Sequence, residues 1–186
     1  YLIERGARRV LIVGGGEDAQ RRSAGAAKLQ LERRGVQVAG NVGIGADLAP
    51  LAQGVDAVLL AMKGPQARAL VPQLALAGIN ANTRVATSQI TSGTGKPAED
   101  MALDGIVYPA ETWGSRDVPG LPSQASAAAR LDTAKGPAAR LFAFGFDAWL
   151  VTAYLERLAL SNNADIPGAT GRLSLDGFGN VLRQPS

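Results

Sequence analysis

The sequence predicts an α/β fold in which a mostly parallel, doubly wound sheet carries helices on its faces. Short β-rich runs alternate with stretches of helical composition through residues 8–108, as parallel strands joined by crossover helices require. The run at 55–61 is apolar at every position except Asp56, which is typical of a strand covered on both faces. Apolar residues make up 46% of the chain and glycines number 23, which suits close helix–sheet packing and tight turns.

The first part of the chain is expected to supply the sheet. Gly35 and Gly78 are placed to end two helices, because glycine readily takes the backbone conformation of a helix C-cap. Asp47 can cap a short helix between them. Strands are expected at 8–13, 36–42, 55–61, 83–87 and 105–108, and helices at 19–34, 47–53 and 64–77.

The second part is expected to be mostly helical, with a terminal hairpin whose turn contains Asp176, Gly177 and Gly179. The expected elements are a Gly-, Pro- and Ser-rich connection (113–124), a small amphipathic helix (124–133), one long helix (140–160) and two strands (171–176 and 180–183). Pro137 is well placed near the start of the long helix. That helix is apolar on two faces, so we expect other segments to cover both. Its apolar run is too short to cross a bilayer unbroken.

Composition excludes several classes of function. The chain has no Cys and no His, which rules out thiol chemistry, His-based acid–base catalysis, the Ser-His-Asp triad and most zinc sites. The net charge is only +3 and the basic residues are scattered, so no nucleic-acid partner is predicted. Asp56, Asp100 and Asp104 have no metal-ligand spacing. We therefore expect no metal, no cofactor and no catalytic residue.

Residues 14–19, Gly-Gly-Gly-Glu-Asp-Ala, match a G-x-G-x-x-A pattern between a predicted strand and a predicted helix. Glu17 and Asp18 count against a dinucleotide, because two carboxylates oppose a pyrophosphate. The second strand ends in Ala-Gly-Asn, without the acid that would hold a ribose. A turn at a strand end is the favoured interpretation, and a dinucleotide-binding enzyme domain is the least favoured function.

Polar residues follow several of the predicted parallel strands, where ligands bind in open sheets. The candidate cleft comprises Gly14, Gly15, Gly16, Lys63, Thr87, Ser88, Gln89, Glu111 and Trp113. These residues can hold a polar small molecule, although any loop edge has a similar makeup. The sequence offers no identifiable general base that could activate the hydroxyl of Thr87 or Ser88, so it does not support an enzyme.

Several motifs resemble a known family. Residues 169–176, followed by Gly179 and Val181, resemble the G-x-L-x-x-D-x-x-G hairpin of type 1 periplasmic solute-binding proteins. Residues 140–149 with 167–173 resemble the LppC-type lipoproteins known as penicillin-binding protein activators. The runs 56–61, 66–68 and 85–88 match that family's strand and helix pattern as well.

The resemblance implies a domain with two α/β lobes. Residues 1–123 would form the second lobe, and residues 124–186 the crossing helices and hairpin of the same domain. The chain opens on Tyr1, without the first lobe's opening strands or a lipid-bearing Cys, so we expect a C-terminal fragment. Membrane attachment would come only through a lipid anchor outside this chain, on the periplasmic side of the bacterial outer membrane.

The function that the resemblance implies is non-enzymatic. Such a protein binds and stimulates a bifunctional peptidoglycan synthase, a class A penicillin-binding protein, and peptidoglycan itself is a further candidate partner. The alternative is a solute-binding lobe for an amino acid or peptide-like ligand, although residues 107–113 depart from amino-acid-binding relatives. In a fragment, a homodimer is one way to bury the long helix.

Overall fold

The computed structural model describes residues 1–91, 97–134, 138–161 and 163–184, so Pro137 lies outside the described residues. The chain divides into two compact units, Tyr1–Pro109 and Ala110–Ser186, and each is described here by itself. The division expected from sequence, after residue 123 and within one domain, stays a prediction. Among the described residues, none of the helices is long and apolar enough to cross a membrane.

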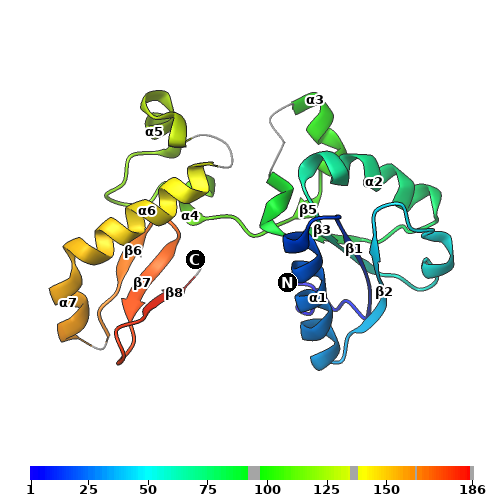
Figure 1. The fold of residues 1–186 in the computed structure, drawn as a ribbon, viewed down its shortest axis with the longest axis horizontal. Coiled ribbons are helices and arrows are strands. Elements are labelled where there is room, and N and C mark those ends of the chain that lie inside the picture. The colour runs from blue at the N-terminus through cyan, green and yellow to red at the C-terminus, as the bar shows by residue number, and fades with distance from the viewer. Residues whose placement is uncertain (92–96, 135–137, 162, 185–186) are drawn as a thin grey trace. The chain divides into compact units, whose positions relative to one another are not determined.

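The first unit is built on a five-stranded parallel sheet with the strand order β2-β1-β3-β4-β5 (Figure 1). Its strands are β1 (Arg9–Gly14), β2 (Gln37–Gly43), β3 (Ala57–Ala61), β4 (Thr83–Ala86) and β5 (Ile106–Val107). Its helices are α1 (Asp18–Arg33), η1 (Ala49–Leu51), α2 (Gly64–Leu76), η2 (Ser88–Thr91), α3 (Pro97–Asp100) and η3 (Met101–Leu103). The predicted α/β class and parallel sheet are confirmed.

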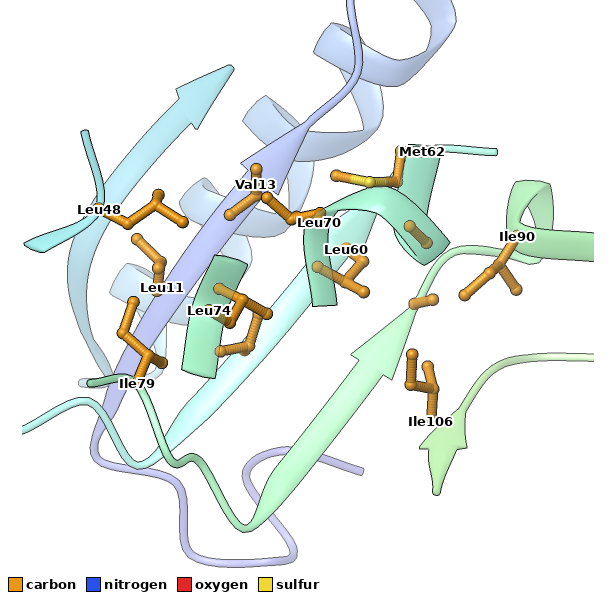
Figure 2. Packing of buried hydrophobic residues seen from close by; sticks show 13 residues of the cluster. Leu11, Val13, Leu48, Leu60, Met62, Leu70, Leu74, Ile79, Ile90 and Ile106 are labelled. Carbon is orange, nitrogen blue, oxygen red and sulfur yellow. The ribbon is translucent and has the colours of Figure 1, made fainter. Parts of the chain in front are cut away.

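Successive residues of β1 point to opposite faces of this sheet, and a different helix covers each face. Ile12 packs in a cluster with Leu31 of α1. Leu11 packs in another cluster with Leu70 of α2, which Figure 2 shows. Helices therefore pack on both faces of the sheet, which buries its central strands.

The second unit combines helices with a three-stranded antiparallel sheet of order β6-β7-β8. Its elements are α4 (Thr112–Ser115), α5 (Gln124–Arg130), η4 (Asp132–Ala134), α6 (Ala138–Ala153), α7 (Leu155–Leu160), β6 (Ile166–Gly168), β7 (Gly171–Leu175) and β8 (Val181–Gln184). The hairpin of β7 and β8 and the small helix α5 match the predictions. The connection at 113–124 contains the short helix α4, and β6 was not predicted.

The prediction of one long helix over 140–160 is wrong, because the helix is interrupted at Tyr154 (φ −111°, ψ 18°). The interruption separates α6 from α7. Leu158 of α7 is then buried in a cluster with Ile166 and Leu173 of the small sheet. Helix α7 therefore packs onto the small sheet.

The expected cover of α6 is present on one face only. Phe142 and Phe146 pack in the core of the second unit. Leu141 and Trp149 are 74% and 62% exposed, and although the Trp149 ring lies 5.5 Å from that of Phe146, the described residues of the second unit leave both side chains largely uncovered. A homodimer that would bury them stays a prediction.

The turn between β7 and β8 predicts a pH dependence. The Asp176 carboxylate accepts hydrogen bonds from the Asn180 side chain (2.8 Å) and from the amides of Asn180 (2.8 Å) and Phe178 (2.9 Å). These bonds, that from the Asn180 side chain first, hold the pKa of Asp176 below its ordinary value of 3.8. A lowered folded-state pKa stabilises the fold above pH 3.8, and this contribution is lost as the pH falls below 3.8 through the folded-state pKa.

We therefore expect the hairpin to loosen in that acidic range, with a chemical-shift change of the Phe178 amide that NMR can follow. Asp176→Asn is the matched control, because it removes the titrating group and keeps the size of the side chain. A Phe178 titration that is unchanged in this variant would contradict the assignment.

Candidate functional site

The candidate cleft residues of the first unit lie at one edge of its sheet. Gly14–16 close β1, Lys63 follows β3, and Thr87 to Gln89 follow β4. These strands are neighbours and parallel, so their carboxyl ends meet. These residues therefore lie along one edge of the sheet, and a cleft that they share stays a prediction.

Two glutamines join the starts of α1 and α2 at this edge. The Gln20 Oε1 accepts from the Glu17 amide (3.2 Å), and the Gln66 Oε1 accepts from the Lys63 amide (3.0 Å). The Gln20 Nε2 also donates to the Gln66 Oε1 (3.1 Å). Gln20 is completely buried, so these bonds are shielded from water. The result is one polar network that links helices on opposite faces of the sheet.

An ion pair lies beside this network. The Lys63 Nζ is 2.6 Å from the Glu17 Oε1, with both side chains about half exposed. Lys63 is therefore already paired with a carboxylate, and the Glu17 amide is taken by Gln20. Both contacts disfavour an anion at this helix start, which argues against the dinucleotide interpretation.

Gly15 is required by the close approach of Gln20. A Cβ at this position would overlap the Gln20 Oε1 and lie 3.0 Å from the Gln66 Oε1. We expect Gly15→Ala to lower the free energy of unfolding by about 2 kcal/mol, because the side chains of the network must shift. Chemical denaturation followed by far-UV circular dichroism measures this loss.

A second variant separates the clash from a general backbone effect. Gly15→Ala combined with Gln20→Ala is expected to be less destabilised than the sum of the two single variants, because the Cβ then has room. Strict additivity would show that Gly15 and Gln20 do not compete for the same space.

A crevice of about 400 Å³ opens beside the glycines, over the ends of β1 and β2. Arg21 and Asn41 line it together with Gly14–16. The Arg21 guanidinium donates to the Gly16 carbonyl and pairs with Asp18, whose carboxylate is its counter-ion. Sequence reasoning missed Arg21 and Asn41 as lining residues, and their only signal was proximity to the ends of the first two strands.

The polar residues after β4 form hydrogen bonds with backbone carbonyls at this edge of the sheet. The Thr87 amide donates to the Leu60 carbonyl (3.0 Å), and the Thr91 hydroxyl donates to the Ser88 carbonyl (3.0 Å). The Thr87 Oγ1 is buried without a hydrogen-bond partner among the described atoms. Neither hydroxyl predicted for the cleft, that of Thr87 or that of Ser88, lines the crevice beside the glycines.

Glu111 and Trp113 belong to the second unit. Glu111 pairs with Arg140 (2.6 Å). Trp113 is only 3% exposed, its Nε1 donates to the Pro122 carbonyl (2.7 Å), and its ring stacks on Phe142 at 5.1 Å. Within this unit Trp113 is therefore a core residue. A single cleft that includes both units stays a prediction.

Two of the three acids without metal-ligand spacing, Asp56 and Asp100, make structural contacts. Asp56 accepts from the amides of Arg8 (2.9 Å) and Arg9 (3.0 Å), and Asp100 pairs with Arg68 (2.5 Å). Over the described ranges, acids form no group of three or more that could hold a metal ion.

Comparison with known proteins gives the family. The model of the family described as "LppC putative lipoprotein" matches residues 20–186. The chain belongs to this LppC family. The predicted resemblance is therefore confirmed, and no match is found among the curated proteins.

Solved structures show the same fold as this LppC-family chain. The C-domain of LpoA (YraM) from Haemophilus influenzae, a regulator of PBP1A, aligns with a TM-score of 0.69 and 18% identity over 98% of this chain and 58% of that one. Full-length LpoA from the same organism aligns with a TM-score of 0.70 and 18% identity over 98% of this chain. This chain therefore spans only 34% of the length of full-length LpoA.

A transport protein shares the architecture as well. An ABC transporter substrate-binding protein from Desulfitobacterium hafniense, in complex with Leu, aligns with a TM-score of 0.63 and 20% identity over 100% of this chain and 58% of that one. The fold is thus that of periplasmic-binding proteins, and the fold alone does not separate a regulator from a solute binder.

Proposed function

We propose that this LppC-family chain is part of a non-catalytic regulator that binds and stimulates a bifunctional peptidoglycan synthase, a class A penicillin-binding protein. The regulator would act on the periplasmic side of the outer membrane and be held there by a lipid anchor outside this chain. The observation that carries the proposal is the family match over residues 20–186. The similarity in fold to the LpoA C-domain, a regulator of PBP1A, supports it.

The geometry of the sheet edge is compatible with a role through protein contact. Lys63 is paired with Glu17, and Gln20 and Gln66 bond each other and the helix starts. These contacts hold polar side chains in fixed positions, where they organise the fold. None of them aligns a nucleophile with a base, which covalent catalysis requires.

Binding to an immobilised class A penicillin-binding protein tests the proposed partner. The purified chain is expected to bind saturably. The substrate-binding protein from D. hafniense is a control matched in fold, and it is expected not to bind. Equal binding by the two proteins would contradict a family-specific contact.

The alternative function is a solute-binding lobe. Two observations favour it: the crevice of about 400 Å³ lined by Arg21 and Asn41, and the similarity in fold to a protein in complex with Leu. The Asn41 amide can donate to the carboxylate of an amino acid or short peptide, whereas the Arg21 guanidinium would have to give up its contact with Asp18 to do so. Titration calorimetry with leucine and dipeptides would then show saturable binding, which Asn41→Ala should weaken.

A further inference from the structure

The net positive charge of the chain lies in its first unit. Residues 1–109 contain 12 basic and 9 acidic residues, and residues 110–186 contain seven of each, so the whole excess of +3 belongs to the first unit. Four arginines of this unit lie at the amino-terminal edge of its sheet, opposite the edge that carries the candidate cleft. These four residues, Arg8, Arg9, Arg33 and Arg34, are called the arginine edge.

Two segments of the chain meet to form the arginine edge. Helix α1 runs back along the sheet and ends at Arg33, with Arg34 as its C-cap. Strand β2 begins three residues later, and the Gln37 amide donates to the Arg8 carbonyl (2.9 Å). Gln37 is also the partner of Arg9 in the parallel pairing of β1 with β2. The four arginines therefore lie on adjoining segments.

The acids near these arginines make other contacts. Asp56 accepts from the amides of Arg8 (2.9 Å) and Arg9 (3.0 Å), and Glu32 pairs with Lys28 (3.8 Å). Over the described part of the chain, no ion pair involves any of the four guanidinium groups. The Arg9 Nε is buried and has no hydrogen-bond partner among the described atoms. An acceptor supplied by a binding partner would therefore stabilise this edge.

The dipole of α1 explains only part of this pattern. Basic side chains are favoured at a helix C-terminus, which accounts for Arg33 and Arg34. Arg8 and Arg9 lie outside the helix, so they need another reason. The stem of Arg9 lies against Gly54, where a Cβ would be 3.5 Å from the Arg9 Cδ, and this contact restricts its motion. Unpaired guanidinium groups gathered on one edge favour an anionic partner.

The composition of this edge favours an acidic protein surface over an anionic membrane. Its four cations are all arginines, which are enriched at protein interfaces, whereas lysine is depleted there. A guanidinium group can pair with a carboxylate through two parallel hydrogen bonds. Surfaces that bind membranes combine basic residues with large apolar side chains that enter the lipid. Within the described segments 7–9, 33–37 and 53–56, no large apolar side chain is exposed.

We propose that the arginine edge is the surface through which this chain contacts an acidic patch of the peptidoglycan synthase. The inference rests on the proposed function, and it adds the surface of this chain and the charge of the partner. Attraction of this kind mainly raises the association rate, and it weakens as salt screens the charges.

Surface plasmon resonance on an immobilised class A penicillin-binding protein tests the proposal. Arg33→Glu combined with Arg34→Glu is expected to weaken binding about tenfold, mainly through slower association. Arg8→Glu, on the other segment, should weaken binding in the same direction. Raising the salt concentration from roughly 50 to 300 mM should lower the affinity of the unmodified chain and narrow its difference from the double variant.

Arg130→Glu combined with Arg157→Glu is the matched control. Both of these arginines are exposed in the last turn of a helix of the second unit, so the control has the same net charge as the variant of Arg33 and Arg34. It should bind as the unmodified chain does. Equal weakening by the control would overturn the proposal, because net charge alone would then explain the loss.

Full binding by the variant of Arg33 and Arg34 would also overturn the proposal and leave the proposed function standing. Sedimentation with phosphatidylglycerol vesicles then shows whether the edge binds a membrane instead, since that variant would lose vesicle binding while it keeps synthase binding. An unmodified chain that does not bind the synthase at either salt concentration would contradict the proposed function as well.

Discussion

Replacement of Asp147 by alanine is expected to lower the free energy of unfolding of the second unit by about 4 kcal/mol. Asp147 lies on α6 and is only 2% exposed. Its carboxylate accepts from the amides of Ala169 (2.6 Å) and Thr170 (3.0 Å) and from the Thr170 hydroxyl. The truncation leaves two buried amides without an acceptor, and each costs about 1–3 kcal/mol.

Tryptophan fluorescence during urea unfolding measures this loss selectively. The chain has two tryptophans, Trp113 and Trp149, and both lie in the second unit. Asp165→Ala is the matched control, because it removes a carboxylate whose partner, Arg172, is exposed. We expect a much smaller shift there. Equal shifts for the two variants would show that Asp147 does not hold α6 to the turn between β6 and β7.

Leu60→Ala is expected to destabilise the first unit by about 3 kcal/mol, because it opens a cavity in a tightly packed core. Leu60 is completely buried on the α2 face of β3, in the cluster that Figure 2 shows. The first unit contains no tryptophan, so far-UV circular dichroism during urea unfolding is the measurement.

Leu59→Ala provides the internal comparison. Leu59 is the next residue on the same strand and faces an open groove, so its removal should cost less than half as much as that of Leu60. Equal losses would show that Leu59 is packed as tightly as Leu60 in solution.

The parallel sheet could be predicted because buried parallel strands have an unambiguous pattern. The run 55–61 is apolar at nearly every position, and glycines mark the helix ends that separate it from its neighbours. Strand β6 was missed because Ile166–Gly168 is only three residues long and contains a proline. The interruption at Tyr154 has no proline or glycine, so nothing local marked it.

Only those parts of the candidate site that depend on which strands are neighbours could be predicted from the sequence. The glycines after β1 and Lys63 after β3 meet because their strands are neighbours. Gln20 and Gln66 were missed, since a glutamine near a helix start usually faces solvent. Their one signal is the spacing of three residues from Glu17 and Lys63. Trp113 was predicted to line the cleft, but in the second unit it stacks on Phe142. Residues so far apart in sequence leave no local pattern that would predict their contact.

The central claim is regulation of a peptidoglycan synthase by contact. Its most direct test is the rate at which a purified class A penicillin-binding protein polymerises and cross-links glycan chains, measured with and without this protein. We expect a saturable increase in that rate and no reaction when the protein is incubated alone with the substrate. An unchanged rate at saturating protein, or turnover by the protein alone, would contradict it.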